Sequence, residues 1–201
     1  MTIILVGKTA SGKTAIKKAL TKNYPVAPLV TCTTRPPRKG EIHGKDYFFL
    51  SYEEFREALY HNQLAEATAY NVSGEPWYYG SYLSYYKEHY PSVDAVIILN
   101  PAGLRQIKEN HPHLDIVSFY IDCPEEIIKK RHENRDNTDA ENFNTRLQND
   151  NIDFKDIEYL VDYKIVNNGT HSPERLAKAI WETVKQHKER RKWCGRLNLN
   201  Q

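Results

Sequence analysis

The stretch TIILVGKTASGKT, residues 2–14, decides the fold of this chain. Its first half is a continuous apolar run that ends at a glycine, which is typical of a strand buried on both faces. Its second half, residues 7–14, matches the pattern G-x-x-x-x-G-K-[ST] and is followed by a helical pattern. In such a loop successive backbone N–H groups face phosphate oxygens, and the helix adds the positive end of its dipole. The stretch therefore predicts a cradle for a nucleoside triphosphate.

The loop residues expected to bind the nucleoside triphosphate are Gly7, Lys8, Thr9, Ala10, Ser11, Gly12, Lys13 and Thr14. Lys13 is expected to reach the β- and γ-phosphates. Thr14 is the expected metal ligand, because a hydroxyl at this position binds the Mg²⁺ that accompanies the triphosphate. The alternative is a glycine-rich turn without a nucleotide.

Strands alternate with helices over most of the chain. The strand patterns cover residues 2–7, 28–34, 93–99, 114–121 and 162–167, and the helical patterns cover residues 11–22, 102–110, 124–134 and 172–190. This alternation predicts an α/β protein, a P-loop three-layer α/β/α fold with a parallel sheet at its core.

Two segments interrupt the alternation. Residues 33–86 are rich in aromatic side chains and contain short strand-like pieces and one helical pattern, which predicts a small α+β insertion. A second segment, residues 133–150, is long and polar and is expected to be mobile. The predicted organisation is a core of residues 1–32 and 87–201, with a lid at about 132–150 and a basic C-terminal tail at about 188–201.

The composition excludes several classes of protein. With 28 basic and 26 acidic residues among 201, the net charge of +2 gives no general argument for nucleic-acid binding. The basic run at residues 185–196 favours the solvated end of a helix, with contact to RNA or a partner as the alternative. Three widely spaced cysteines suit reduced thiols, and no stretch approaches the length of a membrane span. We therefore expect a cytoplasmic protein with no membrane or nucleic-acid partner.

The stretch TTRPPRKGEIHGKDYFF, residues 33–49, indicates a second phosphate site. Its prolines stiffen the loop that carries Arg35 and Arg38, and guanidinium groups bind phosphate through paired N–H donors. From local composition alone, a solvated surface turn is the alternative. The stretch resembles the motif T-T-R-x-P-R-x-G-E-x-x-G-x-D-Y-x-F of guanylate kinases. The resemblance continues in YYGS (residues 78–81) and KIVNN (residues 164–168), and covers roughly residues 2–188.

The resemblance implies that ATP phosphorylates GMP or dGMP and that residues 33–86 are the monophosphate-binding insertion. It implies that the acceptor monophosphate is held by Arg35, Arg38, Tyr47 and Tyr79. Glu66 matches the glutamate that accepts hydrogen bonds from N1–H and the 2-amino group of guanine. Thr31 and Ser81 match hydroxyl positions at the far side of the base. Without the resemblance, Glu66 would be taken for a solvated residue of a strand.

The resemblance also implies a set of catalytic arginines. Arg131, Arg135 and Arg146 match the arginines that close over the transferring phosphates, where they and Lys13 supply positive charge. The alternative for these arginines is a helix surface with ion pairs to acidic neighbours. Asn167 matches a position near the donor adenine, although asparagine at a strand end is equally a turn former.

This chain departs from guanylate kinases at the end of the strand pattern over residues 93–99. The family has two acids there, in the pattern D-x-D, and this chain has Ile98 and Asn100. The first acid is expected to help bind the guanine amino group or a water linked to Mg²⁺, and isoleucine can do neither. Two other functions therefore stay open: a related kinase of another small phosphate ester, such as ribose 1,5-bisphosphate, and a non-catalytic domain that binds partner proteins.

Overall fold

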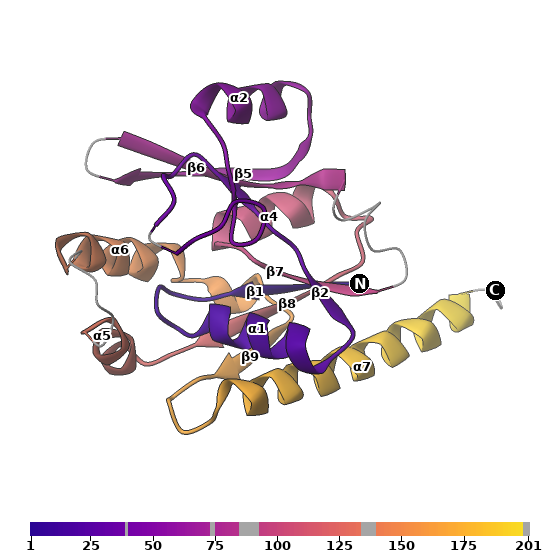
Figure 1. Cartoon of the computed structure of the whole chain (residues 1–201). Helices are drawn as coiled ribbons and strands as arrows, with labels where there is room; N and C mark the ends of the chain where they lie inside the picture. The colour runs from indigo at the N-terminus through magenta and orange to yellow at the C-terminus, as the bar shows by residue number, and fades with distance from the viewer. Residues whose placement is uncertain (39, 73–74, 85–92, 134–139, 199–201) are drawn as a thin grey trace.

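A five-stranded sheet forms around the apolar run at residues 2–6. Its strands are β1 (Thr2–Val6), β2 (Val26–Pro28), β7 (Asp94–Ile98), β8 (Ile116–Asp122) and β9 (Tyr163–Val166). They lie in the order β2-β7-β1-β8-β9, and every pairing is parallel (Figure 1). This computed structural model describes residues 1–38, 40–72, 75–84, 93–133 and 140–198.

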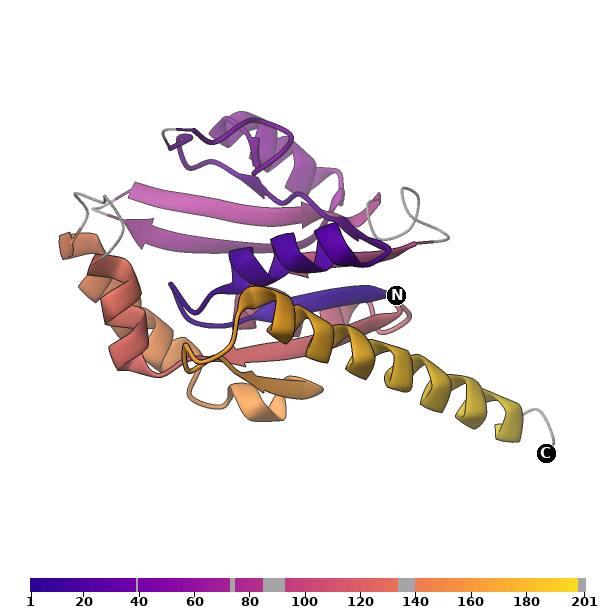
Figure 2. The same cartoon turned by 60° about the horizontal axis from the view of Figure 1, so that its bottom comes forward.

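Helices cover both faces of this sheet. They are α1 (Lys13–Asn23), α4 (Pro101–Asn110), α5 (Glu125–Glu133), α6 (Ala140–Asp153) and α7 (Pro173–Asn198). Because side chains alternate along a strand, Ile3 and Leu5 of β1 pack in one core with α1 and α7, and Ile4 packs in the other with α4. The predicted three-layer α/β/α arrangement around a parallel sheet is confirmed (Figures 1 and 2).

A second sheet lies beyond α4. Its strands are β3 (Cys32–Thr33), β4 (Phe48–Phe49), β5 (Leu64–Val72) and β6 (Glu75–Tyr82), in the order β4-β3-β6-β5. Helix α2 (Tyr52–Tyr60) covers its outer side and begins with a capping box in which Ser51 and Glu54 exchange hydrogen bonds. The edge strand of this sheet, β5, lies against α4 of the core.

The single strand predicted at residues 28–34 is wrong, because two strands in different sheets share this stretch. The Leu29 backbone N–H still donates to Val96 of the core sheet, at 2.9 Å. Two residues later, the Thr31 carbonyl accepts a hydrogen bond from the Phe48 N–H of the second sheet, also at 2.9 Å. The backbone changes partners between these residues, and a continuous apolar pattern carries no sign of that change.

The polar segment at residues 133–150, which we expect to be mobile, is helix α6 over its described part, and two of its side chains are buried. Phe143 and Leu147, four residues apart on one face, are buried against Cys123 and Ile128. The His132 ring of α5 stacks on Phe143 with the ring centroids 3.7 Å apart. Residues 134–139 of this segment lie outside the described residues.

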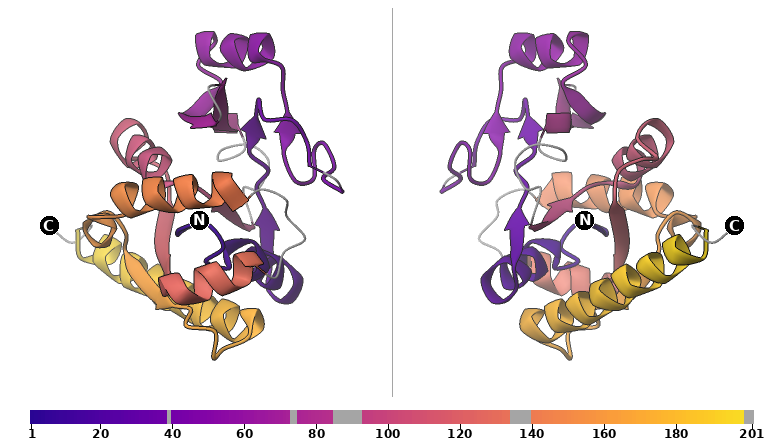
Figure 3. Two further views of the ribbon diagram at one scale, coloured as in Figure 1. Left: turned by 90° about the vertical axis from the view of Figure 1, so that its left-hand side faces the viewer. Right: turned by 90° about the vertical axis from the view of Figure 1, so that its right-hand side faces the viewer.

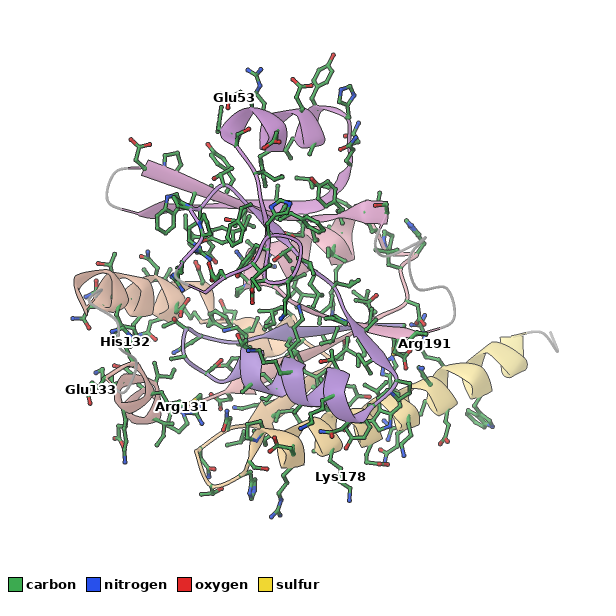
Figure 4. The ribbon with its side chains drawn as sticks, in the orientation of Figure 1. Glu53, Arg131, His132, Glu133, Lys178 and Arg191 are labelled. Atoms are coloured by element: carbon green, nitrogen blue, oxygen red, sulfur yellow. The ribbon has the colours of Figure 1, made fainter. Side chains whose placement is uncertain are left out.

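The basic C-terminal tail predicted at about 188–201 is helical as far as the structure describes it, because α7 continues to Asn198. Lys188 pairs with Asp94 at 2.5 Å, and Arg191 pairs with Asp115 at 2.5 Å. These acids lie at the amino ends of β7 and β8, so part of the basic run ties α7 to the sheet (Figure 4). Among the helices that the structure describes, none combines the length and the apolar character needed to cross a bilayer.

Candidate active site

The loop between β1 and α1 folds as tightly as its glycines predict. A Cβ at Gly7 would lie 2.7 Å from the Ser11 Oγ and 2.8 Å from the Ile121 carbonyl oxygen. Gly12 has a φ of 100°, in the left-handed region that favours glycine, and a Cβ there would meet Asn167 at 2.5 Å. Both positions therefore require glycine, as a phosphate-binding loop does.

The polar groups of the loop converge on its inside. The Lys13 Nζ donates to the carbonyl oxygens of Gly7 and Lys8, at 2.5 and 2.7 Å, so its charge is held against the loop. Ser11 is fully buried, and its Oγ has no hydrogen-bond partner among the described residues. Thr14 is exposed in the first turn of α1, where a hydroxyl can reach a metal ion bound beside the loop.

Arg131 and Asn167 hold the loop from one side. Arg131 donates from Nη1 to the Ser11 carbonyl at 3.1 Å and from Nη2 to the Asn167 Oδ1 at 3.0 Å. The Asn167 Nδ2 donates to the same Ser11 carbonyl at 2.7 Å. Arg131 projects from α5 on the side away from Glu133 (Figure 4). In this structure both predicted site residues therefore support the loop backbone; their contacts with phosphate and adenine stay predictions.

Helix α6 holds the loop from the other side, through contacts that the sequence did not predict. The Thr9 backbone N–H donates to the Asp150 carboxylate, and the Lys8 Nζ donates to the Asn151 Oδ1 at 2.6 Å. Burial raises the pKa of Asp150, while the Thr9 hydrogen bond and Lys13 oppose that shift. The loop thus lies between α5 and α6, as Figure 3 shows at this end of the sheet. Asp150 comes four residues after Arg146, so its position on the same helix face was visible in the sequence.

Arg35 is the most buried of the four residues predicted to hold the acceptor monophosphate, with 4% of its surface exposed. Its Nη2 donates to both carboxylate oxygens of Glu41, at 3.0 and 2.9 Å. The Arg38 backbone N–H donates to the same carboxylate at 2.8 Å, and the Arg38 side chain is exposed. Glu41 therefore fixes the Arg35 guanidinium and the loop that carries Arg38, a function that sequence reasoning missed.

Aromatic side chains line the same end of the second sheet. The Arg35 Cζ lies 5.4 Å from the centre of the Tyr47 ring, and this ring lies 6.3 Å from that of Tyr79. Tyr70 packs edge-on against Tyr79 at 5.7 Å. Burial and Tyr79 raise the pKa of Tyr47, so its hydroxyl remains a donor at neutral pH. The structure thus brings Arg35, Tyr47 and Tyr79 together as the pattern predicts.

Glu66 and Ser81 are paired opposite each other on β5 and β6. Both are buried, and Glu66 has 5% of its surface exposed. Burial raises the pKa of Glu66 to about 7, while a hydrogen bond with the Ser81 side chain opposes the shift. Along the same face, Thr68 is paired with Tyr79, so the carboxylate and the aromatic cluster share one surface.

The two residues that replace the family acids at the end of β7 lie on opposite sides of the sheet. Ile98 is partly buried and packs against the core that contains α1. Asn100 lies on the opposite side, where its Nδ2 donates to the Thr68 Oγ1 at 3.0 Å and to the Tyr70 hydroxyl at 2.7 Å. Ile98 therefore lies on the α1 side of the sheet, and Asn100 is the residue beside Glu66 and its strand.

Three further predicted residues complete the set. Thr31 is half-buried where the chain crosses from β2 to β3. Arg135 lies outside the described residues. Arg146 is part of α6, and its side chain lies outside the described part of the structure.

Comparison with known proteins gives a consistent result. The family model for guanylate kinases matches residues 1–183. The guanylate kinase of Clostridium tetani is 31% identical over 181 residues, which are 89% of this chain and 83% of that protein. That of Lactobacillus acidophilus is 29% identical, with 92% of this chain and 91% of that protein covered. The crystal structure of guanylate kinase from Anaplasma phagocytophilum shares the fold, with a TM-score of 0.71 at 23% identity over 93% of this chain and 85% of that chain. The chain belongs to the guanylate kinase family.

Proposed function

We propose that this chain is an ATP:GMP phosphotransferase, which converts ATP and GMP into ADP and GDP. The observation that carries this proposal is the shared face of β5 and β6. It has the buried carboxylate of Glu66 at one position and the cluster of Arg35, Tyr47 and Tyr79 beyond it. Ser81 and Tyr79 are two residues apart on one strand, about 7 Å. One nucleotide can place its base at the first group and its monophosphate at the second.

The chemistry of Glu66 selects the base. An ionised carboxylate accepts two hydrogen bonds side by side, which suits N1–H and the 2-amino group of guanine. Adenine has an acceptor at N1, so it would leave the buried carboxylate without a donor. A charged group that loses its partner inside a protein costs more free energy than a solvated one. The proposed acceptor is therefore a guanine nucleotide.

The transfer itself requires positioning and positive charge. An oxygen of the GMP phosphate forms a bond to the γ-phosphorus of ATP as the bond to the β–γ bridging oxygen breaks, in line. The acceptor phosphate is already ionised at neutral pH, so no general base is needed. The loop N–H groups and Lys13 stabilise the charge that spreads over the transferred group.

The residues present also fit a magnesium ion bound with ATP. Mg²⁺ in such sites takes one or two protein oxygens and completes its shell with phosphate oxygens and water. The exposed Thr14 hydroxyl at the start of α1 is the protein ligand we propose. When bound, the ion neutralises charge on the β- and γ-phosphates.

The test is ADP release from ATP and Mg²⁺ with GMP, dGMP, AMP, CMP, UMP or ribose 1,5-bisphosphate as acceptor. We expect turnover confined to GMP and dGMP. Lys13→Met should abolish it, which excludes a contaminating kinase. Lys18→Met, an exposed lysine of the same helix, is the matched control and should retain it.

Two other results would replace this proposal. Turnover of ribose 1,5-bisphosphate without turnover of GMP would assign the chain to another phosphate ester, as the Ile98 and Asn100 departures allow. Binding of GMP without any turnover would favour a non-catalytic domain. The presence of Lys13 and Arg131 at the loop argues against the latter.

A further inference from the structure

One face of α4 lies along the strand that carries Glu66. The face consists of Asn100, Gly103 and Gln106, which are three residues apart and therefore aligned on the helix. The strand is β5, which is at the edge of the second sheet. Each of the three residues touches β5 at a different point, and together they join the second sheet to the core.

Gln106 makes the most direct contact. Its Oε1 accepts a hydrogen bond from the Ala67 backbone N–H at 3.0 Å, and its Nε2 donates to the Ala67 carbonyl at 2.9 Å. The side-chain amide thus satisfies both backbone groups of one residue, as a neighbouring strand would do at this edge. Ala67 directly follows Glu66, so the clamp fixes the backbone beside the carboxylate.

Asn100 fixes the strand beyond the clamp. Both hydrogens of its Nδ2 are used, one on Thr68 and one on Tyr70. Its Oδ1 accepts a hydrogen bond from the Gly103 N–H at 2.7 Å and so caps α4. The amide therefore cannot turn without uncapping its own helix.

Gly103 lets the carboxylate lie directly on the helix. A Cβ at this position would lie 2.8 Å from the Glu66 Oε2 and 3.2 Å from its Cδ. With a side chain there, the carboxylate would have to move. Glu66 therefore has α4 beneath it, Ser81 beside it and clamped backbone after it.

We propose that Gln106 is a positioning residue for the acceptor nucleotide, which holds β5 so that the Glu66 carboxylate meets the guanine edge. The inference rests on the proposed function and names a residue outside the acceptor pocket that sets its specificity. A carboxylate that recognises a base through hydrogen bonds must be placed accurately, since a displacement of about 1 Å can cost on the order of 100-fold in rate. The alternative is that Gln106 only covers an exposed strand edge.

The test compares Gln106→Met, which keeps the length and removes both hydrogen bonds, with Arg105→Met, an exposed residue of the same helix. For Gln106→Met we expect a fall in kcat/KM for GMP of roughly 10- to 100-fold. The ratio of kcat/KM for GMP to that for AMP should fall by about 10-fold, with KM for ATP within about 2-fold of wild type. Arg105→Met should change none of these quantities.

A graded variant separates positioning from simple loss of folding. Gln106→Glu can still accept from the Ala67 N–H but cannot donate to the Ala67 carbonyl when ionised, so its GMP preference should lie between those of wild type and Gln106→Met. Thermal unfolding and the affinity for GMP by calorimetry are measured for each variant. If Gln106→Met does not fold, Gln106→Glu alone decides.

Folded Gln106 variants that keep the wild-type affinity for GMP and the wild-type preference for GMP over AMP would overturn the inference. Gln106 would then only cover the exposed edge of β5. Failure of the proposed function is a separate result, because wild-type turnover of GMP measures it without any variant. If the wild type uses another acceptor better, the same ratios are taken with that acceptor against GMP. A Gln106→Met variant that keeps the preference for that acceptor would then overturn the positioning of Glu66 as well.

Discussion

Glu66 lies in β5 with almost no exposed surface, next to Ser81 and above the first turn of α4. Its carboxylate is in the environment that raises a pKa, because burial disfavours the charged form. The guanine binding proposed for Glu66 needs that charged form. Folding therefore favours the protonated form of Glu66, and the proposed binding favours the ionised form. The effect on binding and the effect on stability can be measured separately.

The binding demand predicts a large loss of activity in Glu66→Gln. The amide presents one acceptor and one donor where guanine offers two donors, so one charged hydrogen bond becomes a neutral one and the other is lost. Hydrogen bonds to charged groups contribute about 1.5–3 kcal/mol each, so kcat/KM for GMP should fall by about 100-fold. Steady-state kinetics measure this, with Glu75→Gln as the control on the exposed end of β6. An equal loss in both variants would contradict the assignment of Glu66 to the base.

The folding demand predicts a gain in stability from the same substitution at high pH. The pKa of Glu66 in the folded chain, about 7, is above its ordinary value of 4.5, so the folded state binds more protons than the unfolded state between these values. The free energy of unfolding then falls as pH rises from about 4.5 to 7, by up to about 3 kcal/mol. Glu66→Gln has no such proton to lose.

Denaturant unfolding of wild type and Glu66→Gln at pH 5 and pH 8 measures this difference. We expect the variant to gain stability relative to wild type as the pH rises. Parallel changes in the two proteins would show that the carboxyl of Glu66 titrates near its ordinary value.

At the scale of elements, helix α6 places a carboxylate on the donor loop. Asp150 accepts the hydrogen bond of the Thr9 N–H, one of the groups that a phosphate-binding loop offers to its ligand. ATP must compete with this carboxylate for Thr9, and its negative charge adds repulsion. Asp150→Ala is therefore expected to lower KM for ATP by about 10-fold, the equivalent of about 1.4 kcal/mol for one charged hydrogen bond.

The control for this prediction is Asp156→Ala, which removes an exposed acid that follows the same helix. Titration of each variant with ATP by calorimetry, together with kinetics at saturating GMP, gives the comparison. A higher KM for ATP in Asp150→Ala would show that the carboxylate acts on the nucleotide side of the loop and does not compete with it.

The sequence predicted well those elements whose determining residues are neighbours in the chain. The run at residues 2–6, the glycines of the loop and the first turn of α1 are neighbours in the chain, so one pattern contains the whole reason for the fold there. The split between β2 and β3 has its cause in partners far along the chain, Val96 and Phe48. The packing of α6 depends on the contacts of Phe143 and Leu147 with Cys123 and Ile128. No pattern of single residues predicts such pairings.

The same division applies to the candidate site. Motif spacing was enough to predict Lys13 and Arg35, because each belongs to a short stretch with a recognisable order, whereas Glu66 was predicted only through the resemblance to guanylate kinases. The residues that hold them came only from the structure. Glu41 on Arg35, Asp150 on Thr9 and Gln106 on Ala67 join segments whose spatial proximity depends on the whole fold or on loop geometry.

At the scale of the whole molecule, the two ends of the parallel sheet have different tasks. The donor loop follows the carboxyl end of β1, and the residues beside the acceptor pocket follow the carboxyl end of β7. This is the edge at which α/β sheets bind ligands. The amino ends of β7 and β8 instead receive the cations of α7, through Asp94 and Asp115.

This separation predicts that the α7 ion pairs affect stability without affecting catalysis. Asp94 has 7% of its side chain exposed, and Lys188 has 35% exposed. Lys188→Met leaves a buried carboxylate with less compensating positive charge. This should lower the free energy of unfolding by about 1–2 kcal/mol, between the values for surface and buried pairs.

Lys185→Met is the control, because Lys185 pairs with Glu182 on the exposed surface of the same helix and should change stability by less than about 0.5 kcal/mol. The KM values for ATP and GMP should stay within about 2-fold in both variants, since β1 alone separates the two ends by about 15 Å. A change of KM in Lys188→Met with stability unaltered would mean that α7 is coupled to the site, against the division of tasks between the two ends of the sheet.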